Sequence, residues 1–452
     1  MTDRTGSTHD HPIMTGSADN HSIAADHHPI STGNHSMAKH NHPMTADDVR
    51  LRRTGYFTFF LSGLCAISSG IIVSILQDKY GFSLAMTGTL LSLFSLGNML
   101  SGILCGLLPS RIGLNRTALL FTIGYFIGYV LTALTGIPGV LMLAFLFIGF
   151  AKGTVMGTDS VLVGQHSPDR ARGMQLMHAS YAAGALLCPF VASFLVGINV
   201  NLPMIAVGCI GLLAWFVYLV MRLPGKPAPA GTSDKASSAA SENSVAASED
   251  SSAASDESSS SRRYAFLRDP SFWLLAALLF CQNGAETGVT GWLVTYYKDS
   301  HILEGTLSNY TMTIMWGATL LARLLIAFVL PIRSRFRALT IMGIGCSVLY
   351  AVLVFMTEPV PAVLLLFAFS ACMAGVNPMA VASAGSAMSP EGMGILLPVG
   401  GIGAIVMPLI IGFVGDSAGL RTGMFTDLIP CVGIILLSAI LLLRSRRATP
   451  SA

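Results

Sequence analysis

The chain is 452 residues long; 52% of its residues are hydrophobic, only 11% are charged, and the formal net charge is +3. Soluble domains carry about 25% charged residues, so this composition excludes an ordinary soluble protein and indicates a chain whose surface faces lipid. The small net charge comes without a basic, aromatic-rich patch, which argues against a nucleic-acid partner. The eight cysteines lie apart from one another inside apolar stretches, so we expect neither disulfides nor a thiolate metal site.

Apolar segments of membrane-spanning length, about 20 residues or more, follow one another along most of the chain. Six precede a polar gap, at 55–77, 84–109, 117–136, 138–164, 173–198 and 203–223. Six more follow it, at 271–297, 307–331, 336–357, 361–388, 392–416 and 422–444. We therefore predict an all-α protein of twelve transmembrane helices embedded in a lipid bilayer.

The polar segments divide these helices into two groups of six. Residues 1–54 form a polar tail that is not a cleavable signal peptide, and 226–263 form a stretch rich in Ser, Ala and acidic residues that we expect to be a disordered linker. The predicted bundles are 55–225 and 264–445, followed by a short tail at 446–452.

Histidine is concentrated in the N-terminal tail, which holds most of the chain's eleven histidines. Histidine tracts can bind zinc, copper or nickel. Because no cysteine or defined ligand geometry accompanies them, we expect a disordered tail with no metal site and no cofactor.

The basic residues predict the orientation in the membrane. If both termini are cytoplasmic, the loops on the other side hold only Lys79, Lys298 and Arg421, and almost all remaining Lys and Arg lie inside. The positive-inside rule therefore favours cytoplasmic termini in an inner or plasma membrane.

The two groups of helices share short sequence patterns in the same order. The pairs are LPSR at 108–111 with LPIR at 330–333, SPD at 167–169 with SPE at 389–391, and GAxxxP at 184–189 with the same pattern at 403–408. An internal duplication of six spans, with a solute site near the midplane, is a transporter architecture.

The turn after the second span, GLLPSRIGLNR at 106–116, resembles that of the major facilitator superfamily, which usually has an aspartate where this chain has Ser110. The spans at 178–189 and 283–296 and the ARL at 322–324 are similar to those of the fucose-permease-type sugar:proton symporters. This resemblance implies two rocking six-helix bundles and a site lined by spans 1, 4, 7 and 10. The acids that this family carries in spans 1 and 4 are absent, since span 1 has none and the span-4 position falls on Thr154 or Lys152.

Ionisable residues deep in a membrane are costly and usually face a cavity or a partner. Glu286 in span 7 is the best candidate, either as a proton-coupling carboxylate or as a hydrogen-bonding group for a sugar. Lys152 and Asp159 in span 4 lie seven residues apart, on one helix face. Lys152 suits an anionic or hydroxyl-rich substrate or neutralises Glu286, whereas an ion pair with Asp159 is the structural alternative. Asp159 and His178 are further proton-coupling candidates; a structural role is the alternative for Asp159, and helix packing is the alternative for His178.

Neutral polar and aromatic residues complete the candidate site. We expect Gln282, Asn283, Trp292 and Asn377 to bind substrate beside Lys152 and Glu286; the proline after Asn377 breaks the helix there. The resemblance gives Arg111 and Arg323 structural or gating roles.

No phosphate-binding loop, nucleophile elbow or HExxH motif occurs in the chain, which argues against an ATP-driven pump and against an enzyme. We predict a monomeric secondary transporter working by alternating access, with proton-coupled uptake of a monosaccharide such as L-fucose. Lys152 would also fit an anion such as a sugar acid. An exporter of drugs or metabolites and a non-transporting receptor of the same fold are the alternatives.

Overall fold

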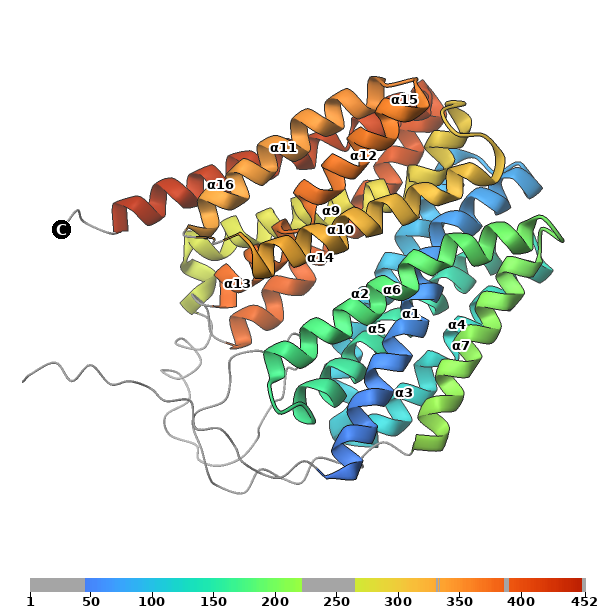
Figure 1. Ribbon diagram of the computed structural model, residues 1–452, viewed down its shortest axis with the longest axis horizontal. Helices are drawn as coiled ribbons and strands as arrows, with labels where there is room; N and C mark the ends of the chain where they lie inside the picture. The colour runs from blue at the N-terminus through green and yellow to red at the C-terminus, as the bar shows by residue number, and fades with distance from the viewer. Residues whose placement is uncertain (1–44, 222–264, 331, 333, 386–389, 449–452) are drawn as a thin grey trace, which may run out of the picture. The chain divides into compact units, whose positions relative to one another are not determined.

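The computed structural model describes residues 45–221, 265–330, 332, 334–385 and 390–448, and all of its regular elements are helices (Figure 1). The helices of the first half are α1 (Ala46–Tyr80), α2 (Leu84–Ile112), α3 (Leu114–Thr122), α4 (Gly124–Leu134), α5 (Pro138–Gln165), α6 (Arg170–Val196) and α7 (Leu202–Met221). Those of the second half are η1 (Ala265–Arg268), α9 (Pro270–Asp299), η2 (Gly305–Asn309), α10 (Tyr310–Phe328), α11 (Arg335–Phe355), α12 (Pro359–Met373), α13 (Val376–Gly385), α14 (Pro390–Ala418), α15 (Leu420–Phe425) and α16 (Leu428–Ala448).

Local sequence signals explain where several of these helices begin and end. Thr45 and Asp48 form a capping box at the start of α1, and Gly81 ends that helix in the left-handed conformation. Prolines occupy the first turn of α5 and α9, where a missing N–H costs nothing. Because of its cap, α1 begins well before residue 55, so the last residues of the predicted tail are helical. Residues 1–44 of that tail and the whole predicted linker, 226–263, lie outside the described residues.

Each predicted transmembrane segment corresponds to a described helix or helix pair. The third segment is α3 with α4, the tenth is α12 with α13, and the twelfth is α15 with α16. Ten spans of the described chain are long and apolar enough to cross a membrane. The two that do not meet that test, α9 and α10, carry Glu286 and Arg323.

The helices pack as two bundles, with α1–α7 in contact with one another and α9–α16 likewise. The repeated GAxxxP pattern has the same packing role in both. Gly184 of α6 lies against the backbone of Phe60 in α1, and Gly403 of α14 lies against the backbone of Phe280 in α9. Only a glycine allows two helix backbones to approach so closely, so the sequence repeat is also a structural one.

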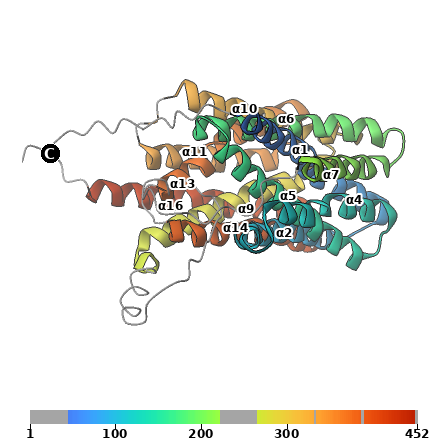
Figure 2. The same ribbon diagram turned by 90° about the horizontal axis from the view of Figure 1, so that it is seen from below.

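The bundles are joined mainly by α2 with α14, by α6 with α10 and η2, and by α1 with α9. In the view of Figure 2, α14 and α2 lie side by side, in agreement with their extensive contacts. Gly88 of α2 meets the backbone of Pro408 in α14, so these helices touch without intervening side chains. α5, which carries Lys152, packs on α2, and α9, which carries Glu286, packs on α14, so both helices flank this junction.

Candidate functional site

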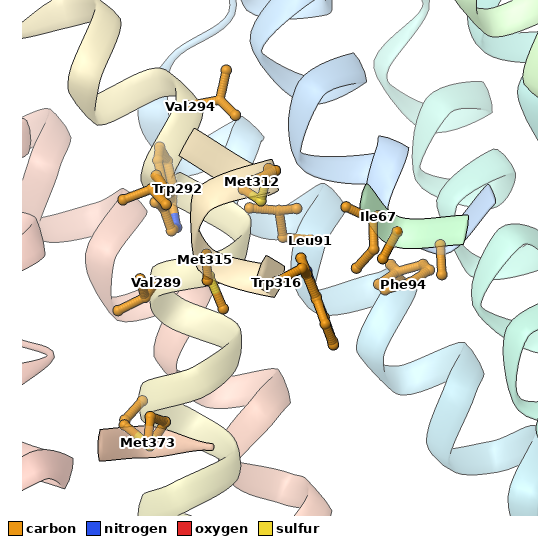
Figure 3. Packing of buried hydrophobic residues seen from close by; sticks show 14 of the residues in the cluster. Ile67, Leu91, Phe94, Val289, Trp292, Val294, Met312, Met315, Trp316 and Met373 are labelled. Atoms are coloured by element: carbon orange, nitrogen blue, oxygen red, sulfur yellow. The ribbon is translucent and has the colours of Figure 1, made fainter. Parts of the chain in front are cut away.

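An apolar layer lies between the bundles next to the polar residues of the site. Figure 3 shows Met312 and Trp316 of α10 together with Ile67 of α1 and with Leu91 and Phe94 of α2. The layer continues to α6, where the ring centroid of Tyr181 lies 5.7 Å from that of Trp316. This aromatic pair is therefore one of the contacts between the two bundles beside the site.

A helix break in the tenth span positions Arg323. The helix stops at Ala374 and resumes as α13, because Pro378 has no N–H to donate to the Ala374 carbonyl four residues earlier. Arg323 Nε of α10 donates to that carbonyl oxygen at 3.3 Å. The predicted break is therefore confirmed, and its freed backbone oxygen holds the arginine at the pocket that also contains Glu286, Thr319 and Ser370.

A chain of side-chain hydrogen bonds links the same break to Glu286. Asn377 Nδ2 donates to Gln282 Oε1 at 2.7 Å and, at 3.3 Å, to Asn283 Oδ1. Gln282 Nε2 in turn donates to Glu286 Oε2 at 2.5 Å. Among the described residues Glu286 Oε1 accepts no hydrogen bond, so one carboxylate oxygen is left for a proton or a substrate hydroxyl. The structure thus brings together four of the predicted polar residues.

Lys152 approaches this group from the other bundle. Its Nζ lies 5.0 Å from the centroid of the Phe94 ring, a cation–π contact, and its charge lies within electrostatic range of Glu286. The two form no salt bridge in the described chain. Lys152 and Glu286 therefore face one another across the boundary between bundles without touching.

His178 and Tyr181 of α6 lie at the edge of the group. The His178 ring packs edge-on against Phe59, with centroids 5.7 Å apart. Both residues lie within electrostatic range of Arg323, and Tyr181 also of Glu286. His178 is thus placed near the charged residues, and its proton-coupling role stays a prediction.

Three predicted residues lie away from this group. Trp292 is fully buried in the C-terminal bundle, where its Nε1 donates to Pro408 O at 3.3 Å, so its ring offers no free face to a substrate. Asp159 is fully buried inside the N-terminal bundle and accepts hydrogen bonds from Thr58 of α1 and Tyr218 of α7. Arg111 is exposed at the end of α2.

Polar contacts join the two bundles at the end where the α1–α2 turn lies. We call this end of the bundles the closed end. The carboxylate of Asp416 in α14 accepts from the backbone N–H groups of Leu84, at 2.7 Å, and Ala85, at 2.8 Å, at the start of α2. Lys298 at the end of α9 forms an ion pair with Asp78 of α1. Each of these contacts joins one bundle to the other.

Residues 55–395 match the family model described as "Major Facilitator Superfamily". This chain belongs to the major facilitator superfamily. Superfamily membership agrees with the two six-helix halves and makes the protein a multi-pass membrane protein with a transporter fold.

Solved structures with similar folds are themselves transporters. A mutant of the nucleoside transporter NupG has a TM-score of 0.66 at 14% identity, covering 87% of this chain and 99% of that one. A bacterial homologue of the human lysosomal transporter Spinster also scores 0.66, at 14% identity and 88% and 98% coverage. The fucose:proton symporter FucP of E. coli scores 0.58 at 16% identity, with 87% and 99% coverage. At these identities the likeness shows the fold alone.

One curated relative matches in sequence. The "Probable anion transporter 4, chloroplastic" of Oryza sativa subsp. japonica is 23% identical over 269 residues, which are 58% of this superfamily member and 44% of the relative. The match therefore spans less than half of the rice protein.

Several residues of the site were not predicted from the sequence. Phe94, Thr319 and Ser370 look like ordinary residues of apolar helices, and only the packing places them beside Lys152 and Arg323. Asp416 had a usable signal, since it is an acid at a helix end in a chain with few charges. Its partner, the start of α2, is far away in sequence and could not be inferred.

Proposed function

We propose that this superfamily member is a secondary active transporter that takes up a monosaccharide-sized solute together with protons, by alternating access. The observation that carries the proposal is Glu286, a carboxylate with one oxygen free of described partners at the boundary between two bundles. A carboxylate in such a place can bind a proton in one conformation and release it in the other. Solved structures of this fold include a fucose:proton symporter and a nucleoside transporter, so the fold is one that can carry a solute with sugar-like hydroxyl groups.

The contacts at the closed end support alternating access. With cytoplasmic termini, as the basic residues predict, the α1–α2 turn lies outside. The contacts of Asp416 and Lys298 then join the bundles on the outside, as they must be joined in the conformation that releases solute into the cytoplasm. In an inner or plasma membrane this is the releasing step of uptake, performed by a monomer.

The test is uptake into proteoliposomes that hold the purified protein. An inward proton gradient should drive accumulation of a sugar from a panel that includes L-fucose, D-galactose and acidic sugars. Glu286→Gln should abolish accumulation but leave exchange of labelled for unlabelled sugar, because exchange needs no net proton movement. Glu304→Gln, the same change at an exposed loop position, is the matched control.

Two outcomes would contradict this proposal. Gradient-driven accumulation by Glu286→Gln at the normal rate would remove the proton role from Glu286. Sugar movement only outward, against the direction of the imposed gradient, would favour the exporter.

A further inference from the structure

The formal charges of the residues at the boundary between the bundles do not sum to zero. Lys152 and Arg323 each carry a positive charge, and Glu286 is the one carboxylate within electrostatic range of Lys152 in the described chain. His178 adds a further positive charge only when it is protonated. Asp159 does not enter this balance, because it accepts its hydrogen bonds inside the N-terminal bundle. The site therefore has an excess of about one positive charge.

Neither cation has a carboxylate partner. Among the described residues no salt bridge involves Lys152 or Arg323. Lys152 contacts the Phe94 ring, and Arg323 uses its Nε on the Ala374 carbonyl. Both side chains are half-buried. Unpaired charge in a membrane protein is costly, so this arrangement is one that a bound anion would stabilise.

Glu286 cannot serve as that partner in this conformation. One of its oxygens is engaged by Gln282, and the acid lies beyond ion-pair distance of both cations. Arg323, by contrast, keeps both terminal nitrogens free of described partners, because its single hydrogen bond is made through Nε. A guanidinium with two free terminal groups matches the two oxygens of a carboxylate.

We propose that the transported solute carries a carboxylate, which Arg323 of the C-terminal bundle and Lys152 of the N-terminal bundle bind from opposite sides. The amide of Asn283 and the hydroxyl of Thr319 suit sugar hydroxyls, so the class is an acidic monosaccharide such as a hexuronate. This inference rests on the proposed function and narrows its substrate class. It also goes beyond sugar recognition, since a ligand held by both bundles links binding to their movement.

Matched sugars test the proposal directly. D-Galacturonate and D-galactose differ only at carbon 6, which is a carboxylate in one and a CH₂OH in the other. Binding to the purified protein, measured by calorimetry, should be at least about tenfold tighter for galacturonate, because a hydrogen bond to a charged group contributes about 1.5–3 kcal/mol. Lys152→Gln and Arg323→Gln should each remove most of that preference while leaving weak galactose binding.

Two further variants keep the result interpretable. Arg421→Gln removes an exposed arginine far from the site and should keep the full preference. Arg323→Lys keeps the positive charge but loses the two terminal N–H groups of the guanidinium, so it should retain part of the preference for galacturonate. Partial retention would show that Arg323→Gln loses its preference because the charge is missing and not because the protein is misfolded. Thermal unfolding of each variant confirms that it is folded.

Transport supplies an independent readout. Symport of a monovalent acid anion with one proton moves no net charge, so a potassium diffusion potential should not drive galacturonate uptake. Symport of a neutral sugar with a proton would respond to that potential. Binding and proton-coupled uptake of galactose or L-fucose with no preference for acids would overturn the carboxylate proposal and leave the proposed function standing. Failure to move any sugar would overturn both.

Discussion

The contact between Asp416 and the start of α2 leads to a direct prediction about conformational change. The Asp416 carboxylate, on α14, accepts from the N–H groups of Leu84 and Ala85, which are among the donors that a helix start leaves without an intrahelical partner. Ser83 caps the same helix through the N–H of Met86. The contact can exist only while the two bundles meet at the closed end, so it stabilises that conformation over one in which this end is open.

The size of this effect follows from the geometry. A side-chain cap of a helix start contributes about 0.5–2 kcal/mol, and a negative charge near that start adds about 0.3–1 kcal/mol. Asp416 is exposed, so solvent and salt weaken the contact. We expect Asp416→Ala to cost the closed conformation about 1–3 kcal/mol, which changes the ratio of the two conformations by about 5- to 150-fold.

Pulsed electron paramagnetic resonance can measure this ratio. Spin labels at Val200 and Glu304, exposed positions near the closed end on opposite bundles, report whether that end is open. Asp416→Ala should shift the distance distribution toward longer values, and Asp416→Glu should shift it less. Glu358→Ala removes an exposed acid before α12 and serves as the control. An unchanged distribution in Asp416→Ala would show that the contact does not hold the bundles together.

Three further substitutions test the packing and the site. Gly403→Ala places a methyl group against the α9 backbone and should destabilise the protein by about 1–3 kcal/mol, whereas Gly401→Ala, which has only ordinary contacts, should leave the thermal unfolding temperature unchanged. Pro378→Ala restores an N–H that competes with Arg323 for the Ala374 carbonyl. Calorimetry should show that galacturonate binding is weakened up to about tenfold. The thermal unfolding temperature should not fall. Asp159→Ala leaves the hydroxyls of Thr58 and Tyr218 without the acceptor that they share and should destabilise the N-terminal bundle by about 1–3 kcal/mol, and a wild-type unfolding temperature would contradict this.

The helices were predictable because lipid imposes one constraint on the whole chain. A segment that crosses the bilayer must be helical and apolar over about 20 residues, and this pattern locates every span to within a few residues at most ends. The start of α1 was the main exception. There the cap at Thr45 extends the helix into a polar sequence, where hydropathy carries no information.

The site was less predictable, because spacing along one helix does not give the partner on another. Lys152 and Asp159 share a face of α5 by sequence spacing, yet Lys152 contacts Phe94 of α2 and Asp159 contacts Thr58 and Tyr218. Different neighbours cover the two halves of this long helix. Trp292 also shows that the position along a helix does not give the partner. It lies on the same helix as Glu286, but its indole N–H donates to Pro408 of α14.

The break in the tenth span connects the two chemical tasks of the site. Its freed carbonyl holds Arg323 of α10, and its Asn377 holds Glu286 through Gln282. A shift of residues 374–377 would therefore change the position of the cation and of the acid together. In the proposed mechanism, Arg323 binds the solute and Glu286 binds the proton. One backbone segment that orients both provides a physical route for coupling the two, without direct contact between them.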